Sequence, residues 1–186
     1  MGSHFSGGTA MVDLVVTLIG PDRVGIVEAV AQTVAAHGGN WLESRMAHLA
    51  GKFAGVLRIE APPEKTAALE AALATLEPSG LRVVVEVGAP ADAGQRYQAM
   101  EVELLGLDRP GLVREISHLL ATRQVNVEEL VTDRYSAPMS GEPMFRARAR
   151  VAVPTAVDLS ELRRGLDRLG GDLMVEIRLA EVVKAG

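Results

Sequence analysis

The sequence predicts an α+β protein built from two copies of one small domain, and three observations support this. An eight-residue stretch occurs twice, as GPDRVGIV at 20–27 and as GLDRPGLV at 106–113. The same offset of 86 residues superposes Asn40 on Asn126. Strand and helix patterns also follow one another in the same order in both halves. A repeat of nearly half the chain indicates one domain type used twice.

The first half is read as strand, helix, strand, strand, helix, strand. An apolar run that ends at Gly20-Pro21 predicts a buried strand. Ile26, Val30 and Val34 then recur at helical spacing, and Gly38-Gly39 follow as a helix stop. The expected strands are 11–19, 40–49, 53–61 and 81–87, and the expected helices begin at Val24 and after Pro62-Pro63.

The second half repeats this order, with strands expected at 98–105, 125–136, 144–153 and 172–183 and helices at 110–123 and 157–169. The order is that of the ferredoxin-like βαββαβ arrangement, so we expect two tandem domains of that fold. The expected bounds are a disordered N-terminal segment at 1–10, domains at 11–88 and 97–184, and a linker at 89–96.

Composition narrows the function classes. The 186 residues carry a net charge of −5 and no cysteine, which excludes disulfides, thiolate nucleophiles and cysteine-ligated metals. Nucleic-acid-binding domains usually carry a net positive charge, so the acidic balance of this chain argues against direct binding of nucleic acid. No apolar run is long enough for a membrane span, and the first ten residues lack an apolar signal core. We therefore expect a cytoplasmic protein with no membrane or direct nucleic-acid contact, and no metal, cofactor or catalytic residue.

The repeated stretch lies at a strand-to-helix turn, where free backbone N–H groups and a partial positive charge suit a carboxylate. A capped tight turn that binds no ligand would also explain the Asp and the Gly of the repeated stretch. Asp22 and Asp108 could cap the helices, Arg23 and Arg109 could bind a carboxylate or face solvent, and Asn40 and Asn126 are expected near the same sheet edge. The candidate ligand-binding residues are Asp22, Arg23, Val24, Gly25, Ile26, Asn40, Asp108, Arg109, Pro110, Gly111, Leu112 and Asn126.

The pattern G-x-D-R-x-G-[IL]-V, an amphipathic helix and then Asn opening a strand resembles the ACT domain. The resemblance covers residues 11–87 and 97–183. It implies a ferredoxin-like module that commonly binds amino acids, often between two copies. A chain of two such domains is similar to the group of glycine cleavage system transcriptional repressors, and the loop at 137–145 resembles that group's insertion. Val24 in place of Pro, and Trp41 after Asn40, depart from the pattern; Trp41 could pack on a ligand, fill the site, or anchor the core.

The resemblance implies a non-catalytic, amino-acid-binding regulatory protein that controls transcription through a protein partner. Its expected effector is a small amino acid such as glycine, contacted by the turns and by the two asparagines across the domain interface, and a homodimer is a reasonable expectation. The alternative is a regulatory subunit of an enzyme of amino-acid metabolism, since residues 116–130 also resemble the ACT region of acetohydroxyacid synthase small subunits. An enzyme is the third possibility, because ACT pairs also precede catalytic domains in some enzymes. The two domains expected here, however, account for nearly all the residues of this chain.

Two further groups of residues have simpler explanations. Arg146, Arg148 and Arg150 alternate along one strand and share one sheet face, where Glu101 and Glu103 could oppose them. We interpret this face as solvated cross-strand ion pairs rather than as a docking surface for an acidic partner. The histidines at 37, 48 and 118 lack the spacing of metal ligands.

Overall fold

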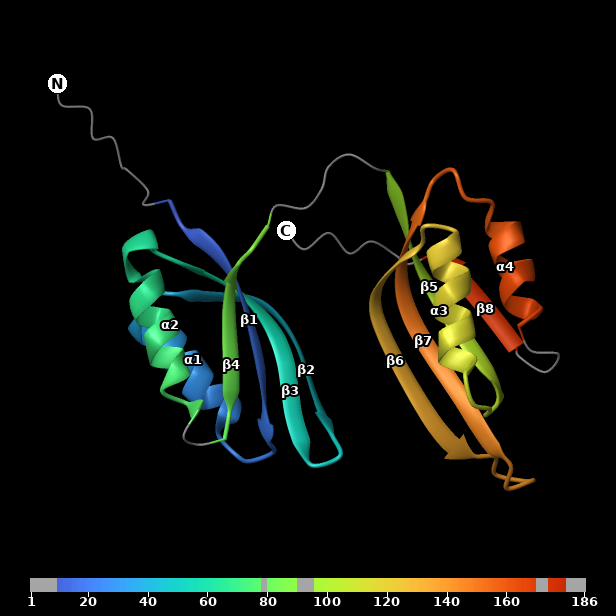
Figure 1. Ribbon diagram of the computed structural model, residues 1–186, viewed down its shortest axis with the longest axis horizontal. Helices are drawn as coiled ribbons and strands as arrows, with labels where there is room; N and C mark the ends of the chain where they lie inside the picture. Colours follow the sequence, from blue (N-terminus) through green and yellow to red (C-terminus); the bar gives the residue numbers. More distant parts are fainter. Residues whose placement is uncertain (1–9, 78–79, 90–95, 170–173, 180–186) are drawn as a thin grey trace. The chain divides into compact units, whose positions relative to one another are not determined.

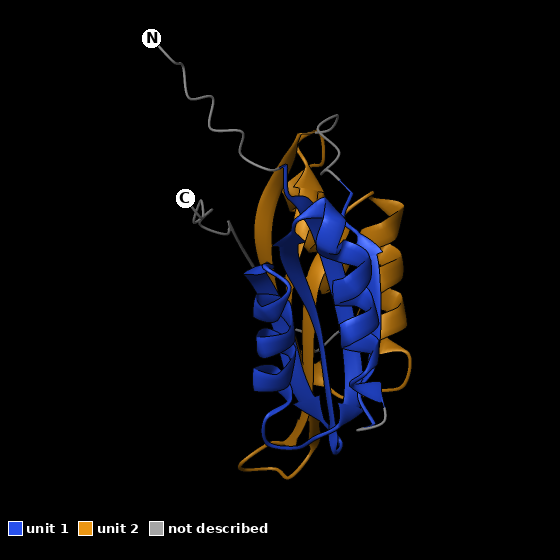
Figure 2. Cartoon of the chain, turned by 90° about the vertical axis from the view of Figure 1, so that its left-hand side faces the viewer, with its two compact units in different colours: residues 1–91 blue, residues 92–186 orange. Residues whose placement is uncertain are grey.

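The computed structural model describes residues 10–77, 80–89, 96–169 and 174–179. The chain divides into two compact units, residues 1–91 and 92–186, which Figure 2 shows in different colours. Residues 1–9 of the predicted N-terminal segment, residues 90–95 of the predicted linker and the chain beyond Leu179 lie outside the described residues. The finer domain bounds at 11–88 and 97–184 therefore stay a prediction.

The first unit is a four-stranded antiparallel sheet with helices on one face (Figure 1). Its strand order is β2-β3-β1-β4. Its elements are β1 (Val12–Pro21), α1 (Ile26–Ala36), β2 (Asn40–Leu49), β3 (Lys52–Ala61), the short 3-10 helix η1 (Pro63–Lys65), α2 (Thr66–Ala74) and β4 (Arg82–Val87). The predicted order of elements is confirmed.

The second unit repeats the arrangement, with strand order β6-β7-β5-β8. Its elements are β5 (Tyr97–Leu107), α3 (Leu112–Thr122), β6 (Asn126–Ser136), β7 (Pro143–Pro154), α4 (Leu159–Asp167) and β8 (Met174–Leu179). Both units also share an irregularity, because the pairing register shifts between Trp41 and Glu43 and between Val127 and Glu129. The two units are thus tandem copies of one ferredoxin-like fold.

Each core lies between one sheet face and the two helices. Leu14, Val16 and Leu18 alternate along β1 and are buried against Val30 and Val34 of α1. Alternation places one strand residue in two on the core face, and the helical spacing of α1 supplies the facing stripe. The second core repeats this packing with Val102, Leu104, Ile116, Leu120, Leu162 and Leu166.

The helices begin later than the sequence predicted. Helices were expected from Val24 and Pro110, whereas α1 and α3 begin at Ile26 and Leu112. The residues between strand and helix form a turn that ends on a glycine in the left-handed conformation, which no helical residue adopts. This turn determines the geometry of the candidate site.

Candidate functional site

The two strand-to-helix turns have the same backbone. Gly25 has φ of 90° and Gly111 has φ of 85°, and each directly precedes its helix. A Cβ added at Gly25 would meet no atom within 4 Å. Glycine is therefore required here by the positive φ and not by crowding. Among the described residues, no side chain caps the start of α1 or α3, so both helix starts are open to an acceptor.

The prediction that the two aspartates cap the helices is wrong. The carboxylate of Asp22 lies 3.7 Å from Nε2 of His48, and that of Asp108 lies 2.7 Å from Nε of Arg134. Both partners are at the end of the second strand of their unit. The main-chain N–H of Asp22 donates to the carbonyl of Gly51, and that of Asp108 donates to the carbonyl of Pro143. The aspartates thus tie each turn to its sheet, and neither of them caps its helix.

The two arginines differ. Arg109 donates to both carboxylate oxygens of Glu115, at 2.9 and 2.6 Å, and to the carbonyl of Leu169. This bond lowers the pKa of Glu115 below its ordinary 4.5 and raises the pKa of Arg109. Ala29 occupies the position in the first unit that matches Glu115. Arg23 is exposed, and it has no hydrogen bond or ion pair to any described residue. Of the two arginines, Arg109 thus has partners among the described residues and Arg23 has none.

The prediction that the asparagines lie at the same sheet edge as the turns is wrong within a unit. Asn40 pairs with Glu60, which pairs with Asp13 near the start of β1, whereas the turn follows the end of β1. The seven-residue length of strand between the two ends spans roughly 23 Å. Helix α1 runs back along the sheet and so carries the chain to the other end. The amide of Asn40 donates to the carboxylate of Glu60 at 3.1 Å.

An open depression of about 270 Å³ lies at the first turn. It is lined by residues 22–28 and by Phe53, which is paired with Gly20 on the neighbouring strand. Val24 is fully exposed there, where the second turn has Pro110. The exchange of Pro for Val leaves the left-handed glycine and the helix start unchanged.

Trp41 is half-buried and packs against the core of the first unit. Of the three roles considered for it, the structure supports that of a core anchor. It follows Asn40 at the far end of the sheet from the first turn, so it does not close the depression beside Val24.

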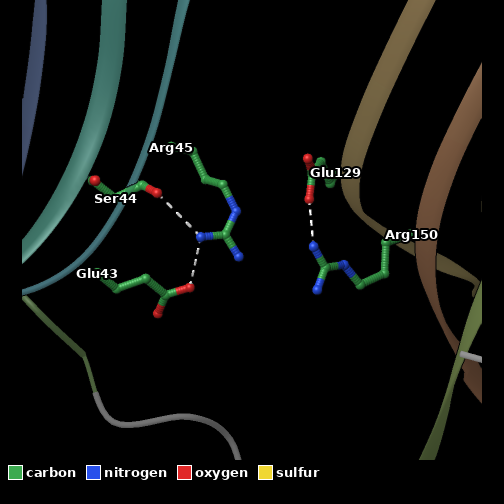
Figure 3. Close-up of polar contacts among 5 residues, drawn as sticks. All are labelled: Glu43, Ser44, Arg45, Glu129 and Arg150. Atoms are coloured by element: carbon green, nitrogen blue, oxygen red, sulfur yellow. Dashed lines mark hydrogen bonds and ion pairs between the residues drawn. The ribbon is translucent and has the colours of Figure 1, made fainter. Parts of the chain in front are cut away.

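The outer face of the second sheet carries cross-strand ion pairs. Arg150 lies opposite Glu101 in register, and Arg148 lies opposite Glu103. The ion pairs, however, are made to β6, from Arg150 to Glu129 and from Arg146 to Asp133. Figure 3 shows the Arg150–Glu129 contact, and a separate first-unit contact in which Arg45 bridges Glu43 and the carbonyl of Ser44. These contacts support the interpretation of the face as solvated cross-strand pairs.

The described residues contain no group of three or more His, Asp and Glu side chains that could hold a metal ion. His37 Nδ1 is hydrogen-bonded to the carbonyl of Thr33 at 2.8 Å, and His48 lies beside Asp22. Among the described helices, none is long and apolar enough to cross a membrane.

Residues 12–86 match the family model of the ACT domain. The match spans the first unit from β1 to β4. An unknown protein from Galdieria sulphuraria has a similar solved structure, at 26% identity and a TM-score of 0.83, with 92% of this chain and 100% of that one covered. A candidate glycine cleavage system transcriptional repressor is similar at 24% identity and a TM-score of 0.66, over 92% of this chain and 98% of that one. No curated protein matches the sequence.

Sequence reasoning missed the residues that make the two strand-to-helix turns unequal. Glu115 was not considered, although its counterpart Ala29 is visible from the repeat offset. His48 and Arg134, which hold the aspartates, also match each other at that offset. The signal was therefore in the sequence, as differences between aligned positions of the two copies. Phe53 could not have been found in this way, because only the strand pairing brings it to the depression.

Proposed function

We propose that this ACT protein is a non-catalytic regulatory protein that binds a free amino acid and acts through a protein partner, as a transcriptional regulator. The observation that carries the proposal is the open start of α1 and α3, where a left-handed glycine exposes N–H groups that no side chain caps. Such a helix start favours a carboxylate. The similar fold of a candidate glycine cleavage system transcriptional repressor supports the transcriptional role.

In the proposed complex the ligand carboxylate accepts hydrogen bonds from the first N–H groups of the helix. The guanidinium of Arg23 provides a further donor at the first turn, because it is exposed and unpaired within the described chain. Charge-assisted bonds of this kind are stronger than neutral ones. Asp22 and Asp108 hold the turns to the sheets. Asn40 and Asn126 lie at the other end of their own sheets, so neither contacts a ligand held at the turn of its own unit.

Ligand binding regulates only if it favours one conformation of the protein over another. The partner is expected to be a protein, such as a transcription factor or an enzyme, since the chain has a net charge of −5. Co-purification of the chain with a large catalytic subunit would favour the enzyme-subunit alternative. Co-purification with a DNA-binding protein would favour the transcriptional role.

A thermal-shift screen of the full chain against the twenty amino acids at millimolar concentration tests the proposal. A ligand at a hundredfold excess over its Kd stabilises the folded state by roughly 2.7 kcal/mol. We expect a selective rise that Arg23→Gln reduces. Arg82→Gln is the matched control, because Arg82 is exposed on the other face of the same sheet. No rise with any amino acid would overturn the proposal.

A further inference from the structure

The first sheet has an outer face, turned away from α1 and α2, that is apolar at its centre (Figure 1). Ile19, Val56 and Val84 remain 46%, 42% and 56% exposed there. They lie on three neighbouring strands, because Val56 and Val84 both pair with Thr17 of β1. The patch is completed by Val15, Ala47 and Ala54. A contiguous exposed apolar patch of this kind is commonly a site of protein association.

The corresponding face of the second sheet is charged instead. Glu103 matches Thr17 at the repeat offset of 86 residues. Arg148 pairs with Glu103 as Val56 pairs with Thr17, so an arginine stands where the first sheet has a valine. Polar side chains are usual on the solvated face of an antiparallel sheet. The second sheet therefore shows a solvated form of this face, and the first sheet departs from it by replacing charges with apolar groups.

The outer face of the first sheet has opposite charges at its two ends. Two ion pairs on it are neutral in themselves, Arg58–Asp13 and Arg45–Glu43. Glu60 and Glu86 make no ion pair with any described residue, and they lie toward the end of the sheet where β1 begins. Lys52 and Arg82 make no ion pair with the described part of the chain either, and they lie toward the end where β1 finishes. The face is thus acidic at one end and basic at the other.

These charges are placed symmetrically about the centre of the patch. Glu60 and Lys52, both on β3, pair with the residues of β1 that lie four positions before and after Thr17. Glu86 and Arg82, both on β4, pair with the residues two positions before and after it. Reversing the direction of the strands therefore exchanges each acidic group with a basic one on the same strand. A surface with this property is complementary to a second copy of itself.

We propose that the outer face of the first sheet is the interface between two copies of this chain. The copies stack face to face about a two-fold axis that lies between the sheets and runs perpendicular to the strands. This axis brings the acidic end of each face to the basic end of the other, so that Glu60 lies near Lys52 of the second copy. An axis along the strands would bring like charges together. The dimer therefore uses a sheet face and not a sheet edge.

The face is large enough for a specific dimer. Four strands about 4.8 Å apart and up to ten residues long present roughly 600 Å², so that two stacked faces cover roughly 1,200 Å². Specific interfaces bury about 1,200–2,000 Å² in total. The area is at the lower end of this range, so we expect a dimer that dissociates on dilution. Burial of the apolar centre drives the association, and the charged ends set the orientation.

Sedimentation equilibrium of the full chain over a range of concentrations tests the inference. Glu60→Lys and Lys52→Glu should each raise the dimer Kd at least about tenfold, because the two-fold axis makes each change bring like charges together twice. An equimolar mixture of the two variants should restore the affinity, because each lysine then faces a glutamate. Glu70→Lys is the matched control for the change in net charge, because Glu70 is exposed on α2, on the opposite side of the sheet.

A fourth variant tests the apolar centre. Val56→Glu puts a carboxylate near the axis, where it faces its own copy in the dimer, and it should raise the Kd at least about a hundredfold. The variant should fold, because Val56 is exposed within its own unit and pairs with Arg45 on β2. Circular dichroism checks the folding.

Three results would overturn the inference. An unaltered chain that is monomeric at every concentration would leave the face to a different protein or to another part of this chain. A dimer that survives in folded Val56→Glu would place the interface elsewhere. Variants that weaken the dimer singly and do not recover when mixed would contradict the two-fold arrangement. Amino-acid binding enters none of these measurements, so the proposed function stands or fails separately.

Discussion

The two units share a backbone fold and differ in the polar groups and spaces that their side chains leave open. In the first unit Arg23 has no partner among the described residues, and Trp41 and Met46 pack against the core. In the second unit Arg109 is bound to Glu115, and an apolar cleft of about 20 Å³ lies between α3 and the strand β6. Among the described residues, the first unit therefore offers an unpaired cation, and the second offers an apolar cleft. A duplicated fold thus need not give two equivalent sites, because a few substitutions change which groups remain unsatisfied.

The largest expected effect concerns the packing of Trp41 against the core of the first unit. Trp41→Ala should lower the free energy of unfolding by about 2 to 3 kcal/mol, because a large side chain packed on the core is removed. Val127→Ala, its counterpart beside the open cleft, should cost less than about 1 kcal/mol. Urea unfolding followed by circular dichroism measures both, since fluorescence is lost with the tryptophan. Equal losses would contradict the difference in packing.

The shared feature of the two turns gives the second prediction. Gly25→Val and Gly111→Val should each cost roughly 1–2 kcal/mol, because a β-branched residue is disfavoured at positive φ. Gly25→Asn and Gly111→Asn should cost less, because asparagine tolerates this conformation. Urea midpoints of the four variants compare them. If valine and asparagine were equally costly, the left-handed backbone would not be the reason for the glycines.

Exchanging the partners of the arginines tests the difference between the turns directly. Ala29→Glu should give Arg23 the partner that Arg109 has, and so reduce the affinity for glycine by about tenfold. Glu115→Ala should free Arg109 and so raise the affinity for glycine. Titration calorimetry with glycine measures both, and Glu28→Gln is the control for a neighbouring charge on α1. An unchanged affinity in Ala29→Glu would show that Arg23 does not contact the ligand.

The smallest expected effect is a pH dependence confined to the second unit. Arg109 holds the pKa of Glu115 below its ordinary 4.5, so the pair contributes stability above that pH. This contribution is lost as the pH falls through the lower pKa of the folded state. Arg109→Gln should therefore lose less stability than the unaltered protein between pH 6 and pH 3. Arg23→Gln should leave this pH dependence unchanged. Urea midpoints at pH 6, 4.5 and 3 measure it.

Much of the fold followed from local patterns in the sequence. The alternation along β1 and the helical stripe of Val30 and Val34 correctly predicted the order and the core face of these elements. The helix starts were misplaced by two residues, because apolar spacing cannot distinguish the first helical turn from a preceding loop that ends on a left-handed glycine. The misplaced starts also led to the wrong assignment of Asp22 and Asp108 as caps.

The sequence by itself determined that one domain type occurs twice, where each turn lies, and that each turn has the same glycine, since these depend on residues close together in the chain. Tertiary structure decided the rest. The pairing of β2 with β3 placed Asn40 far from the turn, and the fold of α4 brought the carbonyl of Leu169 to Arg109. Contacts between distant residues depend on register and packing, and the spacing of residues along the chain contains neither.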